Sequence, residues 1–121
     1  MVLSEKVSQL TSAPPSKDAL FARITALLAS HKILLFMKGT PEAPRCGFSR
    51  RVAALLTQTG RPYQTFDILE DEAVRQGLKE FSNWPTYPQL YVDGELVGGC
   101  DIIEQLAEAN ELADALDGNA S

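Results

Sequence analysis

The chain has 121 residues, 45% of them hydrophobic, and a net charge of −5 at pH 7. This length suits one compact domain and is too short for two ordinary ones. The negative charge argues against a nucleic-acid-binding protein, because phosphate contacts require a basic surface. No apolar run approaches the roughly 18 residues of a membrane helix. Two cysteines do not form a disulfide framework, which favours a reducing compartment.

The first 17 residues are predicted to form an arm or linker. The stretch from Thr11 to Ser16 contains two consecutive prolines and is typical of a loosely attached segment. Residues 1–17 lack the basic start and apolar stretch of a secretory signal, and they contain no arginine, which disfavours a mitochondrial transit peptide. We therefore predict an arm over residues 1–17, one domain over 18–117 and a tail over 118–121.

Hydrophobic periodicity predicts eight elements. Apolar residues three and four positions apart predict the helices, whereas the continuous apolar run 33–37 is typical of a strand buried on both faces. Asp93-Gly94 is the strongest short signal for a hairpin. In chain order, the elements are a helix from Asp18 capped by Ser16 or Asp18, a strand over 33–37, a helix over 47–59, a strand over 63–68, a helix from near Asp71, a hairpin of strands 89–92 and 95–97, and a helix from Asp101. This order favours an α/β fold.

Cys46 lies where a buried strand and a loop lead into a helix. A helix N-terminus favours a thiolate through its unpaired N–H groups and positive dipole. Arg45, Arg50 and Arg51 flank the cysteine and Lys38 ends the preceding strand, so we expect added positive charge. The arginines would equally suit an ordinary solvated surface. A lone cysteine is more often a buried core residue, and its place at a helix start makes the two interpretations about equal.

Ser49 occupies the position of the second cysteine in a Cys-x-x-Cys pair. A dithiol pair closes an internal disulfide, and a serine cannot. Any thiol exchange at Cys46 must therefore use a second thiol from outside this motif.

The segment Phe36-Met-Lys-Gly-Thr-Pro-Glu-Ala-Pro-Arg-Cys-Gly-Phe-Ser49 resembles the active-site segment of monothiol glutaredoxins of the Cys-Gly-Phe-Ser class. Residues 74–79, 82–89 and 98–101 resemble the same family in the same order. The likeness spans residues 18 to 116 and is strongest to the glutaredoxin domains of multidomain cytosolic members. It implies a thioredoxin/glutaredoxin fold with a four-stranded mixed sheet flanked by helices.

The resemblance also implies a glutathione site. Lys38 and Arg75 would bind the glycyl carboxylate, with Lys79 assisting; the alternative for each is a solvated charge. Tyr87 would precede a cis-Pro88 and present its backbone to the cysteinyl part of glutathione. Otherwise Pro88 begins an edge strand.

The end of the predicted hairpin completes that implied site. Gly99 would let the backbone approach the ligand, and the amides of Cys100 and Asp101 would hold the γ-glutamyl carboxylate. The Asp101 side chain would take the ammonium group, and Asp101 and Glu104 also spell a capping box.

Two residues stay open at this point. Many multidomain relatives have an apolar or small residue at the position of Cys100. This cysteine would either form a disulfide with Cys46 on oxidation or be a buried, inert thiol, and we favour the second alternative. Trp84-Pro85 would lie near the thiol at a dimer or partner face, or pack in the core.

The implied function follows from counting ligands. A [2Fe–2S] cluster requires four thiolates, and a homodimer with two glutathiones supplies them from two Cys46 residues and two tripeptides. The resemblance implies cluster transfer to apo iron–sulfur proteins and a role in iron homeostasis, with BolA-type proteins replacing one subunit. It implies a cytoplasmic location and leaves nuclear and organellar ones open.

Two other functions compete with the cluster carrier. One is a glutathione-dependent oxidoreductase that removes glutathione from proteins. The resemblance implies that this activity is weak, because the loop before Cys46 is associated with weak oxidoreductase activity in the family. The other is a redox-silent docking module, which requires Cys46 to be dispensable and is the least favoured.

Overall fold

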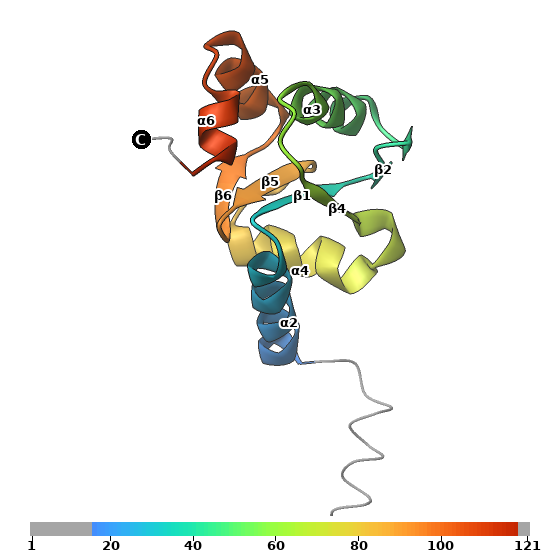
Figure 1. The fold of residues 1–121 in the computed structure, drawn as a ribbon. Helices are drawn as coiled ribbons and strands as arrows, with labels where there is room; N and C mark the ends of the chain where they lie inside the picture. The colour runs from blue at the N-terminus through green and yellow to red at the C-terminus, as the bar shows by residue number, and fades with distance from the viewer. Residues whose placement is uncertain (1–15, 119–121) are drawn as a thin grey trace, which may run out of the picture.

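The computed structural model describes residues 16–118 (Figure 1). Its elements are α2 (Lys17–Ser30), β1 (Ile33–Met37), β2 (Gly39–Thr40), β3 (Ala43–Pro44), α3 (Gly47–Gln58), β4 (Gln64–Asp67), a 3₁₀ turn (Ile68–Glu70), α4 (Glu72–Ser82), β5 (Gln89–Val92), β6 (Glu95–Gly98), α5 (Cys100–Glu108) and α6 (Leu112–Leu116). The predicted arm, apart from its last two residues, and residues 119–121 of the predicted tail lie outside the described range. No helix within 16–118 is long and apolar enough to cross a bilayer.

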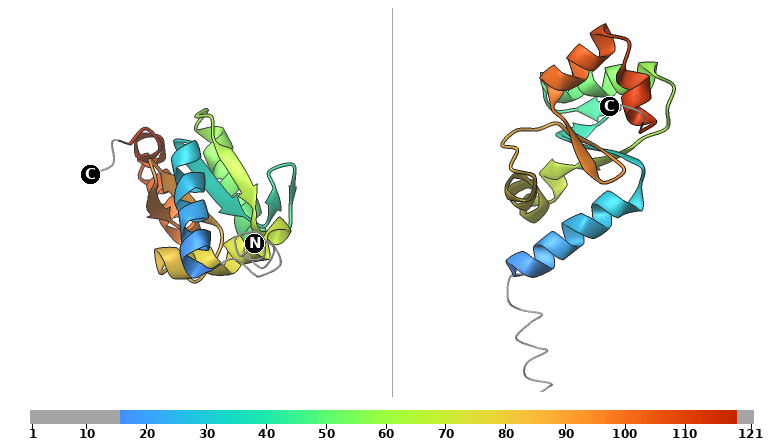
Figure 2. Two further views of the ribbon diagram at one scale, coloured as in Figure 1. Left: turned by 90° about the horizontal axis from the view of Figure 1, so that it is seen from below. Right: turned by 90° about the vertical axis from the view of Figure 1, so that its left-hand side faces the viewer.

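The main sheet has the strand order β4-β1-β5-β6. β1 pairs in parallel with β4 and antiparallel with β5, and β5 pairs antiparallel with β6. The crossover from β1 to β4 runs through α3, as the sequence predicted. The predicted four-stranded mixed sheet flanked by helices is therefore confirmed, with α3, α5 and α6 on one face and α2 and α4 on the other (Figures 1 and 2).

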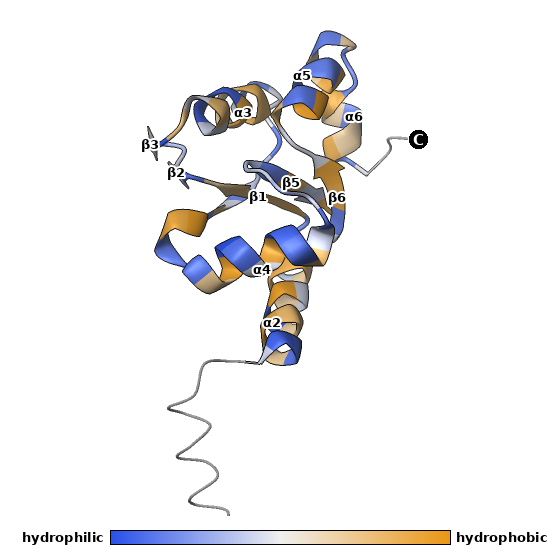
Figure 3. Cartoon of the chain, turned by 180° about the vertical axis from the view of Figure 1, so that it is seen from behind, coloured by the Kyte–Doolittle hydropathy of each residue, from blue (hydrophilic) through white to orange (hydrophobic). Residues whose placement is uncertain are grey.

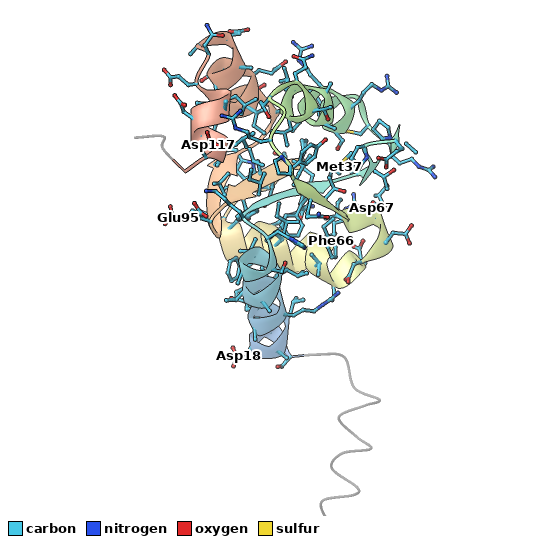
Figure 4. The ribbon with its side chains drawn as sticks, viewed as in Figure 1. Asp18, Met37, Phe66, Asp67, Glu95 and Asp117 are labelled. Atoms are coloured by element: carbon cyan, nitrogen blue, oxygen red, sulfur yellow. The ribbon has the colours of Figure 1, made fainter. Side chains whose placement is uncertain are left out.

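Alternation along β1 divides the core between the two faces, because successive side chains of a strand point to opposite sides. Ile33, Leu35 and Met37 pack in a cluster with residues of α3 and α5, whereas Leu34 and Phe36 pack with residues of α2 and α4. Figure 4 shows Met37 toward α3, away from the α4 side of the sheet. Each fully buried side chain of this kind stabilises the fold by about 1.5–3 kcal/mol.

Two of the helices, α2 and α4, have an N-terminal side-chain cap. Figure 3 shows hydrophilic and hydrophobic residues sharing α4. The Ser16 hydroxyl accepts from the Ala19 N–H at 3.1 Å, which confirms the predicted cap of α2, although this helix begins at Lys17. Asp71 caps α4 by accepting from the Val74 N–H at 3.1 Å.

The capping box that Asp101 and Glu104 offered as an alternative interpretation is absent from α5. This helix begins at Cys100, one residue earlier than predicted, so that Gly99 is its N-cap and no side chain caps it. Asp101 is consequently inside the first turn, and Glu104 forms an ion pair with Arg51.

Four short elements were not predicted from the hydrophobic pattern: β2, β3, the 3₁₀ turn and α6. The strand predicted over 63–68 covers only Gln64–Asp67, because Asp67 accepts from the Leu69 N–H at 2.9 Å and caps a 3₁₀ turn. The hairpin of β2 and β3 and the five-residue helix α6 were not predicted. Elements this short contain too few residues to show a period.

The loop before the cysteine depends on Gly39. This residue has φ +90°, and a Cβ there would lie 2.5 Å from the Ala43 carbonyl oxygen and 2.9 Å from the Arg45 nitrogen. We expect Gly39→Ala to lower the free energy of unfolding by about 1–3 kcal/mol, measured by urea denaturation. Gly60→Ala is the control, because Gly60 has φ +75° but open space around it. Equal losses in the two variants would show that the close contacts at Gly39 have no effect.

Candidate functional site

Cys46 is the N-cap residue of α3. Its backbone is extended (φ −156°, ψ 149°), and its carbonyl accepts the first helical hydrogen bond from the Arg50 N–H at 3.0 Å. The loop in front is held by the Arg45 N–H, which donates to the Lys38 carbonyl at 2.9 Å. The thiol is half-buried and free. The predicted place of the thiol at a helix start is therefore confirmed.

The environment of Cys46 favours the thiolate. Partial burial raises the pKa of Cys46, but hydrogen bonds from the Ser49 N–H and hydroxyl and from the Phe48 N–H, together with the charge of Lys38, lower this pKa by more. The net pKa lies below the ordinary value. Donors at the start of a helix stabilise the negative sulfur directly, so a larger fraction of Cys46 than of an ordinary cysteine is thiolate at neutral pH, and the thiolate is the form that attacks disulfides and binds soft metals.

Ser49 does more than exclude a dithiol. Its side chain is fully buried, and its hydroxyl accepts from the Lys38 N–H at 3.0 Å while it donates to the Cys46 sulfur. The serine thus ties the end of β1 to the thiolate. This role of Ser49 was not predicted, because the neighbouring residues in the sequence do not show that its hydroxyl faces the sulfur.

The arginines near Cys46 act less strongly than expected. Lys38 exerts the strongest charge effect on the pKa of Cys46. Arg51 forms an ion pair with Glu104, and Arg45 and Arg50 are exposed.

We expect Ser49→Ala to raise the pKa of Cys46, because the variant removes the side-chain donor that lowers it. The rate of alkylation by iodoacetamide, followed against pH, would then show its midpoint at higher pH than in the wild-type chain. Arg50→Ala is the control, because it removes an exposed charge on the same helix. An unchanged midpoint in Ser49→Ala would refute the role of the hydroxyl.

A groove of about 530 Å³ lies next to the thiol, within the usual size range of small-molecule sites. Its lining includes seven predicted residues: Lys38, Arg75, Lys79, Tyr87, Gly99, Cys100 and Asp101. Two other predicted residues, Cys46 and Pro88, do not line it, although Lys38 and Phe48 place the groove beside Cys46. It is also lined by Trp84 and Pro85, which the sequence left open, and by Phe48, Thr86 and Ile102, which were not predicted. Of these three residues, only Phe48 could have been predicted, because it lies within the Cys-Gly-Phe-Ser motif.

One end of the groove is cationic. Arg75 and Lys79 lie one turn apart on α4, and Lys38 faces the same groove from the end of β1. The Nε of Arg75 is buried and has no hydrogen-bond partner among residues 16–118. Its only ion pair there is with the exposed Glu72, at 3.8 Å. A buried guanidinium N–H without a partner, next to two lysines, suits an anionic ligand.

The middle of the groove presents backbone groups. The Tyr87–Pro88 peptide bond is cis, as the resemblance implied. The Tyr87 hydroxyl donates to the Arg75 carbonyl at 2.7 Å, and burial raises the pKa of this hydroxyl, which keeps it a donor. Within residues 16–118 the N–H and carbonyl of Tyr87 make no protein hydrogen bond. They are therefore available to an extended peptide-like ligand.

The far end of the groove is the N-terminus of α5. A Cβ on Gly99 would lie 3.2 Å from Trp84 Nε1 and 3.3 Å from the Pro88 carbonyl oxygen, so only glycine fits without displacing the groove wall. The amides of Cys100 and Asp101 have no partner inside the helix. The Asp101 carboxylate is exposed and, in the described part of the chain, has no ion pair. This end suits a ligand group that carries both a carboxylate and an ammonium.

Cys100 and Trp84 both lie in the groove wall. Burial raises the pKa of Cys100, as do the charges of Asp101 and Cys46, and the thiol forms no disulfide in this structure. A raised pKa makes a poor nucleophile, which agrees with the favoured inert thiol, although Cys100 is half-buried rather than buried. Trp84 is half-buried, and its Nε1 has no partner among the described residues.

The described residues contain no cluster of three or more His, Cys, Asp or Glu side chains that could hold a metal ion.

Comparison with known proteins establishes the family. The family model described as Glutaredoxin matches residues 33–97. Monothiol glutaredoxin-S11 from Oryza sativa is 52% identical over 116 residues, and Glutaredoxin-3 from Bos taurus is 52% identical over 114 residues. The chain belongs to the monothiol glutaredoxins. These alignments cover 91% and 94% of this chain but only 24% and 34% of the relatives, so this glutaredoxin corresponds to one part of longer proteins.

Solved structures agree with the fold. The solution structure of reduced poplar apo GrxS14 is 46% identical to this glutaredoxin, has a TM-score of 0.72, and aligns over 84% of this chain and 94% of its own. A buckwheat glutaredoxin–glutathione complex, 23% identical with a TM-score of 0.74 over 88% of this chain and 96% of its own, shares the fold.

Proposed function

We propose that this glutaredoxin binds glutathione in the groove beside Cys46 and holds a [2Fe–2S] cluster between two chains, for transfer to apo-proteins. The observation that supports the proposal most strongly is the row of unpartnered groups along one groove that begins next to a thiol of lowered pKa. Each of these groups would bind a part of glutathione of complementary charge or hydrogen-bonding character.

The fit to glutathione follows the tripeptide from end to end. The cations Lys38, Arg75 and Lys79 suit the glycyl carboxylate, and the free backbone of Tyr87 suits the cysteinyl backbone. The amides and carboxylate at the start of α5 suit the γ-glutamyl group. The fold neighbour from buckwheat was solved with glutathione. This arrangement would place the glutathione sulfur toward Cys46.

The assignment as a cluster carrier rests on the donor count. Cys46 gives one thiolate per chain, and a bound glutathione would add a second, so two chains would complete the four that a [2Fe–2S] cluster requires. Phe48, whose side chain is 64% exposed beside the groove, offers apolar surface to a second chain. Because half of the ligands would dissociate freely, the cluster would be labile and transferable.

Anaerobic reconstitution with iron, sulfide and glutathione tests this proposal. We expect a coloured dimer, seen in the visible spectrum and in the mass in solution, that becomes a colourless monomer when glutathione is withdrawn. A chain that binds glutathione but takes up no cluster under these conditions would refute the carrier function. The proposed partners are a second copy of the chain, BolA-type proteins and apo iron–sulfur proteins.

The proposed location is the cytoplasm. One relative, 50% identical over 96 residues that make up 79% of this chain, is named a chloroplastic monothiol glutaredoxin from Oryza sativa. The location in cells therefore requires imaging of the tagged protein.

The lowered pKa of Cys46 also favours a second function, removal of glutathione from proteins. The Cys46 thiolate would attack the glutathione sulfur of a mixed disulfide, and the target protein would leave as a thiolate. A second glutathione thiolate would then attack the new disulfide, releasing glutathione disulfide and restoring Cys46. Rapid turnover of a glutathionylated peptide by a chain that never takes up iron would favour this enzyme over the carrier.

A further inference from the structure

The segment between α4 and β5 forms one wall of the groove through Trp84, Pro85, Thr86 and Tyr87. Only its start is fixed by a helix cap: Asn83 adopts φ 53°, and the Trp84 N–H donates to the Lys79 carbonyl at 3.1 Å, a Schellman arrangement. The remainder lies outside any helix or strand until β5 begins at Gln89. Some other contact must therefore fix the wall in the middle.

Gln89 supplies that contact. Its side chain is 0% exposed, and its amide nitrogen donates to the Trp84 carbonyl at 3.0 Å and to the Thr86 carbonyl at 3.2 Å. Its amide oxygen accepts from the Tyr91 hydroxyl at 2.8 Å. The Ser82 hydroxyl lies 3.3 Å from the same oxygen, but its one hydrogen points to the Leu78 carbonyl, which is closer at 2.7 Å. Both N–H donors of the amide and its oxygen are therefore paired.

A primary amide is the only side-chain group that fits these contacts. Gln has two N–H donors and an acceptor oxygen, which match two carbonyls on one side and the Tyr91 hydroxyl on the other. An ionised carboxylate would face two carbonyls without a donor, and an apolar side chain would leave both carbonyls unpaired at a cost. Because the side chain is buried and both of its donors are paired with wall carbonyls, it holds one arrangement of the wall.

We propose that Gln89 is a positioning residue for the ligand groove. It does not line the groove, and it fixes the two carbonyls that flank Pro85, immediately before Tyr87. The backbone of Tyr87 is thereby held toward the groove before glutathione arrives, which reduces the ordering cost of binding. The inference rests on the proposed binding of glutathione in this groove.

The test compares Gln89→Met with Tyr91→Phe in the full chain. Both variants disturb the same buried network, but Tyr91→Phe removes only a hydroxyl that donates to the amide oxygen and leaves both bonds to the wall. Urea denaturation measures the stability of each variant, and amide chemical-shift titration with reduced glutathione measures Kd. The chemical shift of the Tyr87 amide without ligand reports the conformation of the wall itself.

We expect Gln89→Met to raise Kd for glutathione roughly tenfold and to shift the Tyr87 amide resonance without ligand. Tyr91→Phe is expected to lower stability and leave Kd and the Tyr87 amide unchanged. Gln89→Glu, which keeps the size and removes N–H donors, is expected to behave like Gln89→Met and serves if Gln89→Met does not fold.

Two results would overturn the inference. One is a Kd for glutathione that rises in proportion to the loss of unfolding free energy in all the variants. The other is a Tyr87 amide chemical shift that Gln89→Met leaves unchanged. If the wild-type chain bound no glutathione, the proposed function would fail, and the Tyr87 readout would still decide whether Gln89 fixes the wall.

Discussion

Cys46→Ser is expected to abolish the coloured dimer completely. Cys46 gives the one thiolate of lowered pKa beside the groove, and a serine hydroxyl is neither ionised at neutral pH nor a soft ligand for iron. The groove itself lies beside Cys46 and is lined by other residues. We therefore expect the variant to bind reduced glutathione with unchanged Kd in a chemical-shift titration, and to remain monomeric and colourless after anaerobic reconstitution.

Cys100→Ser is the matched control for this loss. Cys100 is also at the start of a helix and beside the same groove, but burial and the charge of Asp101 raise its pKa. We expect this variant to form the coloured dimer with wild-type yield. A colourless Cys100→Ser variant, or a coloured Cys46→Ser variant, would place a cluster ligand at the wrong cysteine and contradict the account.

Arg75→Gln is expected to raise Kd for glutathione about 10- to 100-fold, because a charge-assisted hydrogen bond contributes about 1.5–3 kcal/mol. The Nε of this guanidinium is buried without a partner in the described part of the chain, and a bound carboxylate would supply one. Chemical-shift titration at physiological ionic strength measures the change.

The control for Arg75 is Arg50→Gln, which removes one positive charge from an exposed position on α3 outside the groove lining. We expect Kd to change little, because exposed charges at a distance are screened by salt. An equal loss of affinity in both variants would mean that glutathione responds to net charge and not to a built site.

Much of the fold follows from local patterns. The bounds of the strand over residues 33–37 were predicted correctly, because the apolar run is continuous and glycine and proline follow it closely. The Asp93-Gly94 turn fixed the hairpin, and both residues have positive φ in the structure. Patterns of this kind depend only on neighbouring residues, which the sequence shows directly.

The parts that could not be predicted depend on contacts between distant segments. Glu104 offered a capping box to its own helix as an alternative interpretation but pairs with Arg51 on α3, a partner 53 positions away. The role of Ser49 depends on the end of β1, 11 positions earlier. Gln89 is a different case, because its partners Trp84, Thr86 and Tyr91 lie within five positions of it. Its role escaped prediction because the segment before it has no regular structure, so the sequence does not show that two carbonyls of this segment turn toward the amide.

The most direct test of the account is the mixed disulfide that forms when the reduced chain meets glutathione disulfide. The Cys46 thiolate would attack one sulfur, and one glutathione would leave as a thiolate. We predict a single adduct on Cys46, found by mass spectrometry, with contacts from the attached tripeptide to Arg75 and the Tyr87 amide in NMR spectra. An adduct on Cys100, or a tripeptide on Cys46 that extends into solvent away from the groove, would contradict the account.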